Sequence, residues 1–115
     1  MKLLVADDSK VSRAMLSAIT KSWGYEVILA EDGEQAWQVM QEDDAPKLLL
    51  LDWEMPKMNG IEVCERVIAK YPETPPYIVL LTSRSASDDI VEGLSKGAND
   101  YLSKPFDTAE LQVRL

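Results

Sequence analysis

The chain has no histidine and a single cysteine among its 115 residues. Without histidine, the commonest general base and metal ligand is missing, and Ser-His-Asp and Cys-His mechanisms are excluded. The lone Cys64 forms no internal disulfide, which fits a reducing cytoplasm, where we expect the protein to reside. No apolar run approaches the roughly 18 residues of a membrane helix, and the N-terminus has no signal-peptide pattern. We therefore expect no membrane association.

Positive charge is also scarce, because 12 basic residues stand against 20 acidic ones and the net charge is −8. Direct binding of nucleic acid requires a basic face, so we expect none. The apolar fraction of 46% is ordinary for a soluble globular protein. The length is close to the commonest domain size, which predicts a single domain over residues 1–115.

Short apolar runs alternate along the chain with segments of helical spacing. Five β-α units in sequence indicate a parallel sheet covered by helices on both faces. In such sheets the functional crevice lies beyond the carboxyl ends of the strands, where the winding direction reverses. The predicted strands lie at residues 2–6, 25–30, 47–52, 77–82 and 99–103.

Apolar residues at helical spacing predict a buried face for each helix, and polar or glycine residues predict the helix ends. The first helix has Val11, Met15, Ile19 and Trp23, with Gly24 as its stop; the second has Asp32 and Gln35 as a capping box, then Ala36, Val39 and Met40; the third follows Gly60 with Ile61, Cys64, Ile68 and Tyr71; the fourth has Ser85 and Asp88 as a capping box, then Ile90, Val91 and Leu94, and stops at Gly97; the fifth begins near Asp107 with Leu111 and Leu115.

Acidic residues follow two of the predicted strands. Asp52 ends a run of four leucines, which is typical of a strand buried on both faces, and we expect its carboxylate to face solvent there. Asp7 and Asp8 follow the first strand. If the two strands are neighbours, three carboxylates meet, and each pair at ~4 Å repels by about 1 kcal/mol in water and about 4 at a dielectric constant of 20. The arrangement predicts a divalent cation, although a helix cap alone would explain Asp8 or Ser9.

Two other predicted strands end in polar residues. Thr82 ends the fourth strand, where its hydroxyl is placed to bond an incoming oxyanion, and the small Ser83 after it leaves room. Lys104 follows the fifth strand, where its ammonium group would act as a counter-charge to the carboxylates and bind phosphate as a point charge. The ordinary alternatives are a β-branched residue at a strand end and a surface lysine.

With these polar residues in this order at the ends of its strands, the chain resembles the receiver domain of bacterial two-component response regulators. The resemblance covers essentially the whole chain, and it implies a flavodoxin-like, doubly wound α/β fold with a five-stranded parallel sheet in the order 2-1-3-4-5. The matching motifs are Asp7-Asp8, Asp52 with Met55-Pro56 and Asn59-Gly60 after it, Thr82-Ser83, and the stretch from Gly97 to Phe106.

The resemblance also implies a role for each site residue. Asp52 would be the phosphoacceptor. Mg²⁺, or Mn²⁺ in its place, would be held by Asp8, Asp52 and the main-chain carbonyl of Glu54, while Asp7 holds a metal-bound water. Lys104, Thr82 and Ser83 would contact the phosphoryl group, and Tyr101 would turn inward behind Thr82. The Lys104-Pro105 peptide would be cis, and the rim residues Glu54 and Arg84 would tune self-dephosphorylation.

The implied function is that of a signalling switch and not of an enzyme. A sensor histidine kinase or a phosphotransfer protein would phosphorylate Asp52, which we expect to be ionised at neutral pH, so that no general base is needed. Phosphorylation would switch the face formed by the fourth helix, the fifth strand and the fifth helix, a candidate homodimer interface. Residues 92–115 resemble receivers fused to output domains such as diguanylate cyclases. Because the fifth helix is short, we expect this chain to be the N-terminal part of a longer regulator.

Three alternatives stay open at this point. A flavin or nucleotide binder shares the layered fold but needs a phosphate cradle in the first β-α loop, where this chain has Asp7-Asp8-Ser9. A Mg²⁺-dependent phosphohydrolase would carry a second acid two residues after its nucleophile, on the first strand, and a cap domain. A degenerate receiver would keep the fold as a docking module and lose the site, whereas all the key residues are present here.

Overall fold

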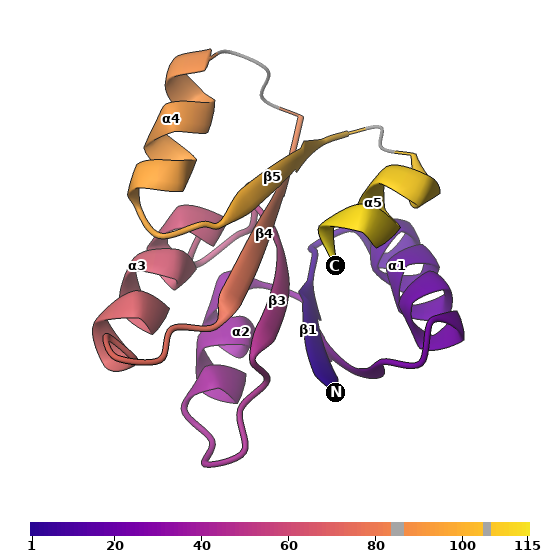
Figure 1. Ribbon diagram of the computed structural model, residues 1–115, viewed down its shortest axis with the longest axis horizontal. Coiled ribbons are helices and arrows are strands. Elements are labelled where there is room, and N and C mark those ends of the chain that lie inside the picture. The colour runs from indigo at the N-terminus through magenta and orange to yellow at the C-terminus, as the bar shows by residue number, and fades with distance from the viewer. Residues whose placement is uncertain (84–86, 105–106) are drawn as a thin grey trace.

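The computed structural model describes residues 1–83, 87–104 and 107–115. Strands and helices alternate throughout these residues (Figure 1). The elements are β1 (Lys2–Ala6), α1 (Lys10–Ser22), β2 (Glu26–Ala30), α2 (Gly33–Met40), β3 (Leu48–Asp52), α3 (Gly60–Lys70), β4 (Tyr77–Thr82), α4 (Ser87–Ser95), β5 (Asp100–Ser103) and α5 (Thr108–Arg114).

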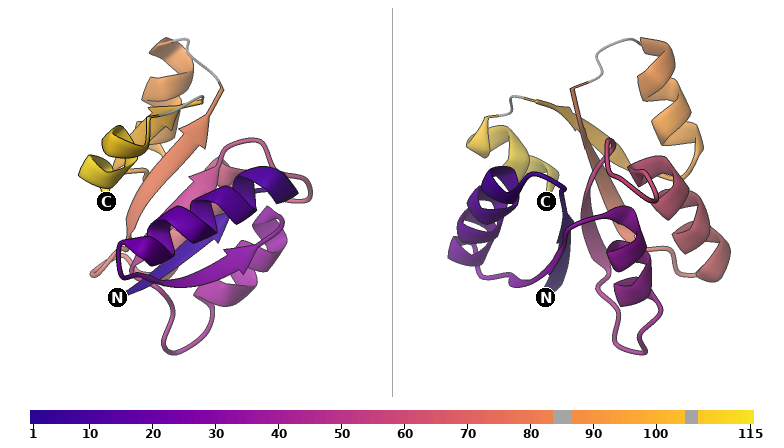
Figure 2. Two further views of the ribbon diagram at one scale, coloured as in Figure 1. Left: turned by 90° about the vertical axis from the view of Figure 1, so that its right-hand side faces the viewer. Right: turned by 180° about the vertical axis from the view of Figure 1, so that it is seen from behind.

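The strands form one parallel sheet in the order β2-β1-β3-β4-β5. Helices α1 and α5 cover one face of this sheet, and α2, α3 and α4 cover the other (Figures 1 and 2). The predicted fold class and strand order are therefore confirmed. Each predicted strand agrees with the observed one to within one residue at either end.

Alternate residues of the central strands feed two separate cores. Leu49 and Leu51 of β3 point into the core under α2, α3 and α4, whereas Leu48 and Leu50 point into the core under α1 and α5. All four leucines are at most 5% exposed. A strand buried on both faces explains the uninterrupted leucine run, because successive side chains of a strand point to opposite sides of the sheet.

Polar residues begin and end the helices largely where the sequence predicts. Ser9 is the N-cap of α1, and Asp32 is the N-cap of α2. The Gln35 side chain accepts from the amide of Glu31, not of Asp32, so this capping box is only half formed. A complete capping box joins Asn59 and Glu62 at the start of α3. Gly24 follows α1 with φ = +93°, a conformation that side chains disfavour.

The predicted buried face of α1 is wrong for Val11 and Met15, whereas Ile19 and Trp23 are half-buried and Trp23 packs against the core. Val11 is 80% exposed and Met15 is 47% exposed, whereas Leu16, Ser17 and Thr20 are buried. A row of residues four apart rotates about 40° per step around a helix of 3.6 residues per turn, so one end of a long row leaves the buried side. Burial of Thr20 is compatible with its polarity, because its hydroxyl donates to the carbonyl of Leu16 at 2.7 Å.

The predicted face of α4 is also wrong for Val91 and Leu94, which are 64% and 40% exposed. Helix α4 instead approaches the sheet through Gly93, which is buried. The Ile90 side chain and the capping box predicted from Ser85 and Asp88 lie outside the described residues. Among the described helices, we find none with the length and apolar character needed to span a membrane.

Candidate functional site

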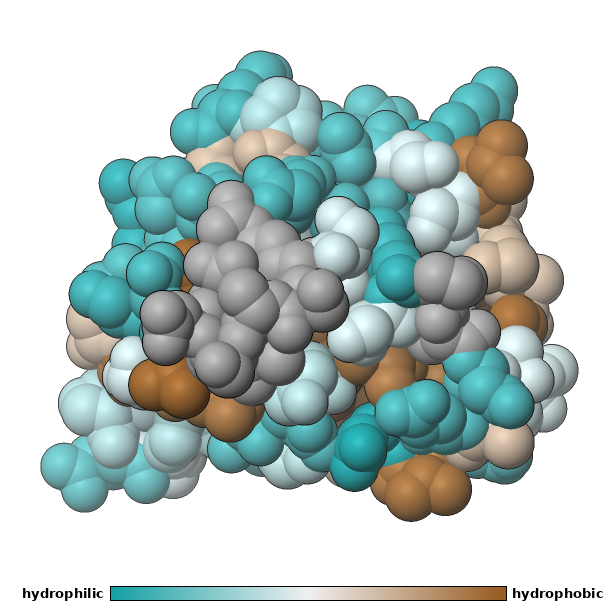
Figure 3. All heavy atoms as spheres, turned by 90° about the horizontal axis from the view of Figure 1, so that it is seen from above, coloured by the Kyte–Doolittle hydropathy of each residue, from teal (hydrophilic) through white to brown (hydrophobic). Residues whose placement is uncertain are grey.

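The register of the sheet brings the predicted carboxylates to one edge. Ala6 of β1 lies opposite Leu51 of β3, so that Asp7 and Asp52 stand side by side where their strands end. Asp8 follows at the start of the loop to α1. Ligand oxygens of Asp7, Asp8 and Asp52 lie within 4.8 Å of one another. Figure 3 looks onto this end of the molecule, where hydrophilic side chains predominate.

Lys104 reaches this carboxylate cluster from the other side. Thr82 of β4 is paired with Ser103 of β5, and the backbone amide of Lys104 donates to the Thr82 carbonyl at 2.8 Å. The Lys104 Nζ atom then lies 3.3 Å from Asp7 Oδ2 and 3.4 Å from Asp52 Oδ2. The predicted counter-charge is therefore present, and this single ammonium group bridges two carboxylates.

Asp7 is fully buried and held by the start of α1. Its Oδ1 atom accepts from the amide of Ser9 at 2.9 Å, and its Oδ2 atom accepts from the hydroxyl of Ser12 at 2.6 Å. Arg13 donates to the Asp7 carbonyl at 2.7 Å. The sequence analysis missed Ser12 and Arg13. Both residues lie one turn into the helix that follows the acidic pair, and this position could have predicted their contacts with Asp7.

Burial raises the pKa of Asp52 to about 7, because the residue is only 5% exposed and an ionised carboxylate is poorly solvated there. Lys104 lowers this pKa, Asp7 raises it, the amide of Glu54 lowers it and the Asp8 carboxyl raises it. Two expectations are thus corrected. Asp52 does not face solvent, and without a cation it is not fully ionised at neutral pH.

The carboxylate cluster fits a Mg²⁺ ion. Mg²⁺ binds oxygen ligands at 2.0–2.1 Å, so two ligands on opposite sides of the ion lie about 4.2 Å apart, which is compatible with ligand atoms that all lie within 4.8 Å of one another. The Asp7 oxygens already accept from Ser9, Ser12 and Lys104, which favours contact through a water molecule over direct coordination. Asp8 is exposed and Asp52 is adjacent, so these two are the better direct ligands.

The other predicted site residues surround this cluster. Thr82 is buried at the end of β4, Ser83 is exposed, and Tyr101 is half-buried on β5. Glu54 is exposed, and its amide donates to Asp52 Oδ1 at 3.3 Å. Arg84 and Pro105, and with them the predicted cis peptide, lie outside the described residues.

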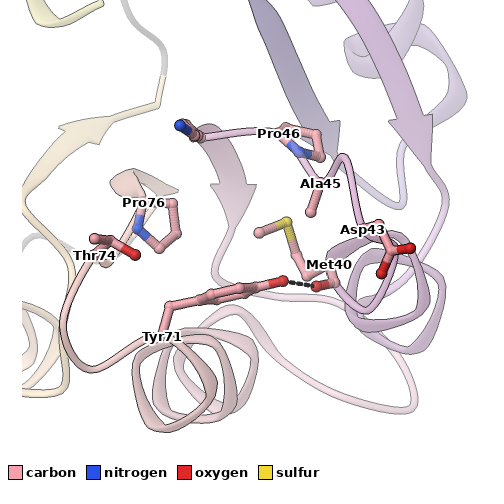
Figure 4. Close-up of a pocket in the computed structure, with 8 residues that line it drawn as sticks. Met40, Asp43, Ala45, Pro46, Tyr71, Thr74 and Pro76 are labelled. Atoms are coloured by element: carbon pink, nitrogen blue, oxygen red, sulfur yellow. Dashed lines mark hydrogen bonds between the residues drawn. The ribbon is translucent and has the colours of Figure 1, made fainter.

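A hollow of about 110 Å³ lies at the opposite end of the strands, where the loops before β3 and β4 meet (Figure 4). The Tyr71 hydroxyl on its floor donates to the Met40 carbonyl at 2.7 Å. This hollow is remote from Asp52, so the carboxylates and not a cavity identify the candidate site. Its lining residues are Met40, Asp43, Ala45, Pro46, Lys47, Tyr71, Thr74 and Pro76.

Comparison with known proteins gives one consistent result. A model of the response regulator receiver domain matches residues 3–115. A chemotaxis protein CheY homolog of Campylobacter jejuni is 36% identical over 118 aligned residues, which cover 100% of this chain and 89% of that protein. The transcriptional regulatory protein CpxR of Escherichia coli is 41% identical over 114 residues, which are 99% of this chain and 47% of CpxR.

Solved structures agree with the sequence comparisons. The receiver domain of the sensor histidine kinase PA1611 from Pseudomonas aeruginosa, with a magnesium ion coordinated in its active site cleft, is 32% identical with a TM-score of 0.85. That match covers 97% of this chain and 91% of the solved one. A response regulator from Chloroflexus aurantiacus is 34% identical with a TM-score of 0.90, over 98% of this chain and 92% of that chain.

Proposed function

The chain belongs to the response regulator receiver domain family, and from that premise we propose that Asp52 is the residue on which it accepts a phosphoryl group in two-component signalling. The phosphoacceptor role in such signalling follows from the family. The assignment to Asp52 is supported by its place between two other carboxylates and an ammonium group, at the end of a strand buried on both faces.

The transfer step asks little of the protein beyond position and charge. A carboxylate oxygen of Asp52 attacks the donor's phosphorus, the bond from phosphorus to the donor's histidine nitrogen breaks, and that nitrogen keeps the electron pair. Lys104, between Asp7 and Asp52, is placed to stabilise the incoming phosphoryl oxygens. Thr82 is paired with Ser103 beside Lys104, and in this proposal its hydroxyl donates to the same oxygens. Ser83 is the next residue along the chain.

Mg²⁺ is the cofactor that the site fits, with Mn²⁺ as a substitute of similar chemistry. We assign Asp8, Asp52 and the Glu54 carbonyl as its ligands and Asp7 as the holder of a bound water. When bound, the ion offsets the repulsion between the Asp52 carboxylate and the phosphoryl oxygens. The same charge favours the ionised form of Asp52, whose pKa otherwise lies near neutrality.

A phosphoryl group would act on the rest of the domain as a switch. It gives Thr82 and Lys104 new oxygens to bind and biases α4, β5 and α5 toward a second arrangement, with Tyr101 turning inward. Moving an equilibrium from 1:99 to 99:1 takes about 5.5 kcal/mol. Two charge-assisted hydrogen bonds at roughly 1.5–3 kcal/mol each reach this value only at the upper end. We therefore propose that dimerisation through this face, or partner binding, completes the change.

The partners follow from the same assignment. A histidine kinase or a phosphotransfer protein is the donor, because this chain has no histidine of its own. CpxR is about twice the length of this chain. In line with that relative, we propose that an output domain is joined to the receiver, of the diguanylate cyclase kind or another, and that the protein acts in the cytoplasm.

Metal removal tests the proposed site. Adding Mg²⁺ to the metal-free protein should change the fluorescence of Trp53, and acetyl phosphate should change it again, because this buried indole adjoins Asp52. EDTA should reverse the first change and block the second. Trp23 and Trp37 contribute background, so Trp53→Phe is the control. A response of full size in that variant would contradict the prediction.

The lifetime of the phosphoryl group gives another test. We propose that Glu54 and Arg84, two residues after Asp52 and Thr82, hinder the water that hydrolyses the anhydride. Glu54→Ala and Arg84→Ala should each shorten the half-life of the phosphorylated protein several-fold, as followed by intact mass after the donor is removed. Glu73→Ala, which removes an exposed acid of the loop before β4, is a matched control. Unchanged half-lives in both rim variants would end this assignment.

A further inference from the structure

Helix α4 lies close to Trp53, the residue that follows Asp52, at the position of Gly93. A Cβ atom at residue 93 would lie 3.1 Å from Trp53 Cζ3 and 3.0 Å from Leu80 Cδ1, tighter than ordinary packing. Glycine inside a helix is less stable than alanine, so this position favours close approach over helix stability. The indole of Trp53 is 2% exposed and fills the space that the missing side chain leaves.

Trp53 is also tied directly to the chemistry of Asp52. Its backbone amide donates to the Leu81 carbonyl at 2.8 Å, and its carbonyl accepts from the Gly60 amide at 2.9 Å. The peptide unit that joins Trp53 to Glu54 donates from its N–H to Asp52 Oδ1 at 3.3 Å. One rigid peptide therefore connects the reactive carboxylate, the start of α3 and the residue that carries the indole.

We propose that Trp53 and Gly93 form a size-matched contact that transmits the state of Asp52 to α4. Conversion of the Asp52 carboxylate to an acyl phosphate changes the charge on the oxygen that accepts from Glu54. The Trp53–Glu54 peptide then adjusts, and the indole carries the displacement to α4, because at Gly93 no side chain separates ring from helix. Trp53 is a positioning residue in this account, and it does not touch the phosphoryl group. The inference rests on the proposed function.

Thermodynamic linkage gives the test. If the Trp53–Gly93 contact couples α4 to the site, a change at residue 93 must alter the affinity of the site for a phosphoryl mimic. The probe is beryllofluoride with Mg²⁺, whose binding is measured by fluorine NMR. Gly93→Ala should change its affinity by at least about 3-fold in either direction, the scale of coupling between contacting residues. In the Trp53→Phe background, the same substitution should change the affinity by less than about 1.5-fold.

A matched control separates coupling from helix stability. Ser95→Ala also raises the helix propensity of α4, but at an exposed position on the same helix, and should leave the affinity unchanged. A change below 3-fold for Gly93→Ala, or one of equal size in the Trp53→Phe background, would overturn the proposal. So would an equal effect of Ser95→Ala.

Hydrogen exchange provides a second measurement that does not depend on the Gly93 variant. Beryllofluoride should alter the protection of the amides of residues 91–97 in the wild-type chain, and Trp53→Phe should remove this response while the mimic still binds. An unaltered α4, or an equal response in Trp53→Phe, would refute the contact as transmitter. Failure of the wild-type chain to bind beryllofluoride would instead refute the proposed function, so the two failures are distinguishable.

Discussion

An Asp52→Asn variant should take up no phosphoryl group from acetyl phosphate in the presence of Mg²⁺, whereas the wild-type chain gains the mass of one. The amide has nearly the same shape, but it lacks the negatively charged oxygen that attacks phosphorus. Asp7 does not replace it, because both of its oxygens are bound by Ser9, Ser12 and Lys104, and Asp8 is assigned as a metal ligand. Intact mass spectrometry over a time course measures the outcome.

The control for this experiment is Asp43→Asn, which removes an exposed acid near the hollow at the far end of the strands. It should be phosphorylated at the wild-type rate. Labelling of Asp52→Asn at that same rate would show that another residue accepts the group. Complete loss in Asp52→Asn with retention in Asp43→Asn locates the reaction at residue 52.

Stability without metal should depend strongly on pH through the same residue. The pKa of Asp52 is about 7 in the folded chain and about 3.9 in an unfolded one. Between these values the folded chain holds a proton that the unfolded chain has released. The free energy of unfolding therefore falls as the pH rises from about 4 to about 7. At 1.36 kcal/mol per unit, the loss is at most about 4 kcal/mol.

Comparison with Asp52→Asn isolates this contribution, because asparagine does not titrate. In EDTA, the variant should be only slightly different from the wild-type chain near pH 4 and increasingly more stable as the pH approaches 8. Urea unfolding at a series of pH values measures the difference. Saturating Mg²⁺ should reduce it, because a cation stabilises the ionised form. A difference that stays constant with pH would contradict the assigned cause, which is burial beside Asp7 and Asp8 with one ammonium group from Lys104.

Much of the fold could be predicted because most of the strands contain a continuous apolar run that is easily identified in the sequence. A run such as Leu48–Leu51 fits a strand buried on both faces, and polar residues directly after such runs must lie at one sheet edge. The strand order, in contrast, came from family resemblance. The spacing of apolar residues predicted where the helices lie but not which side of α1 is buried. Val11 and Met15 are as apolar as residues of a buried face, and only the packed structure shows that they are exposed.

The electrostatics of the site were harder to predict from the sequence than the residues that form it. The residue type of Asp52 indicates an ordinary acid, whereas its burial in the folded chain, together with the neighbouring Asp7 and Asp8, raises its pKa. Ser12 and Arg13 were missed because a serine and an arginine in the first turns of a helix are usually solvated. Their contacts with Asp7 depend on how the loop brings the helix back over the strand.

The two cores share the strands β1, β3 and β4, and β3 gives Leu49 and Leu51 to one core and Leu48 and Leu50 to the other. A chain that loses either helical layer therefore exposes the backbone that carries Asp52. We therefore expect a half-folded chain to lack a working acceptor, so that damage to the fold abolishes the signal and does not imitate it. Turnover by proteases would then remove molecules that have already stopped signalling.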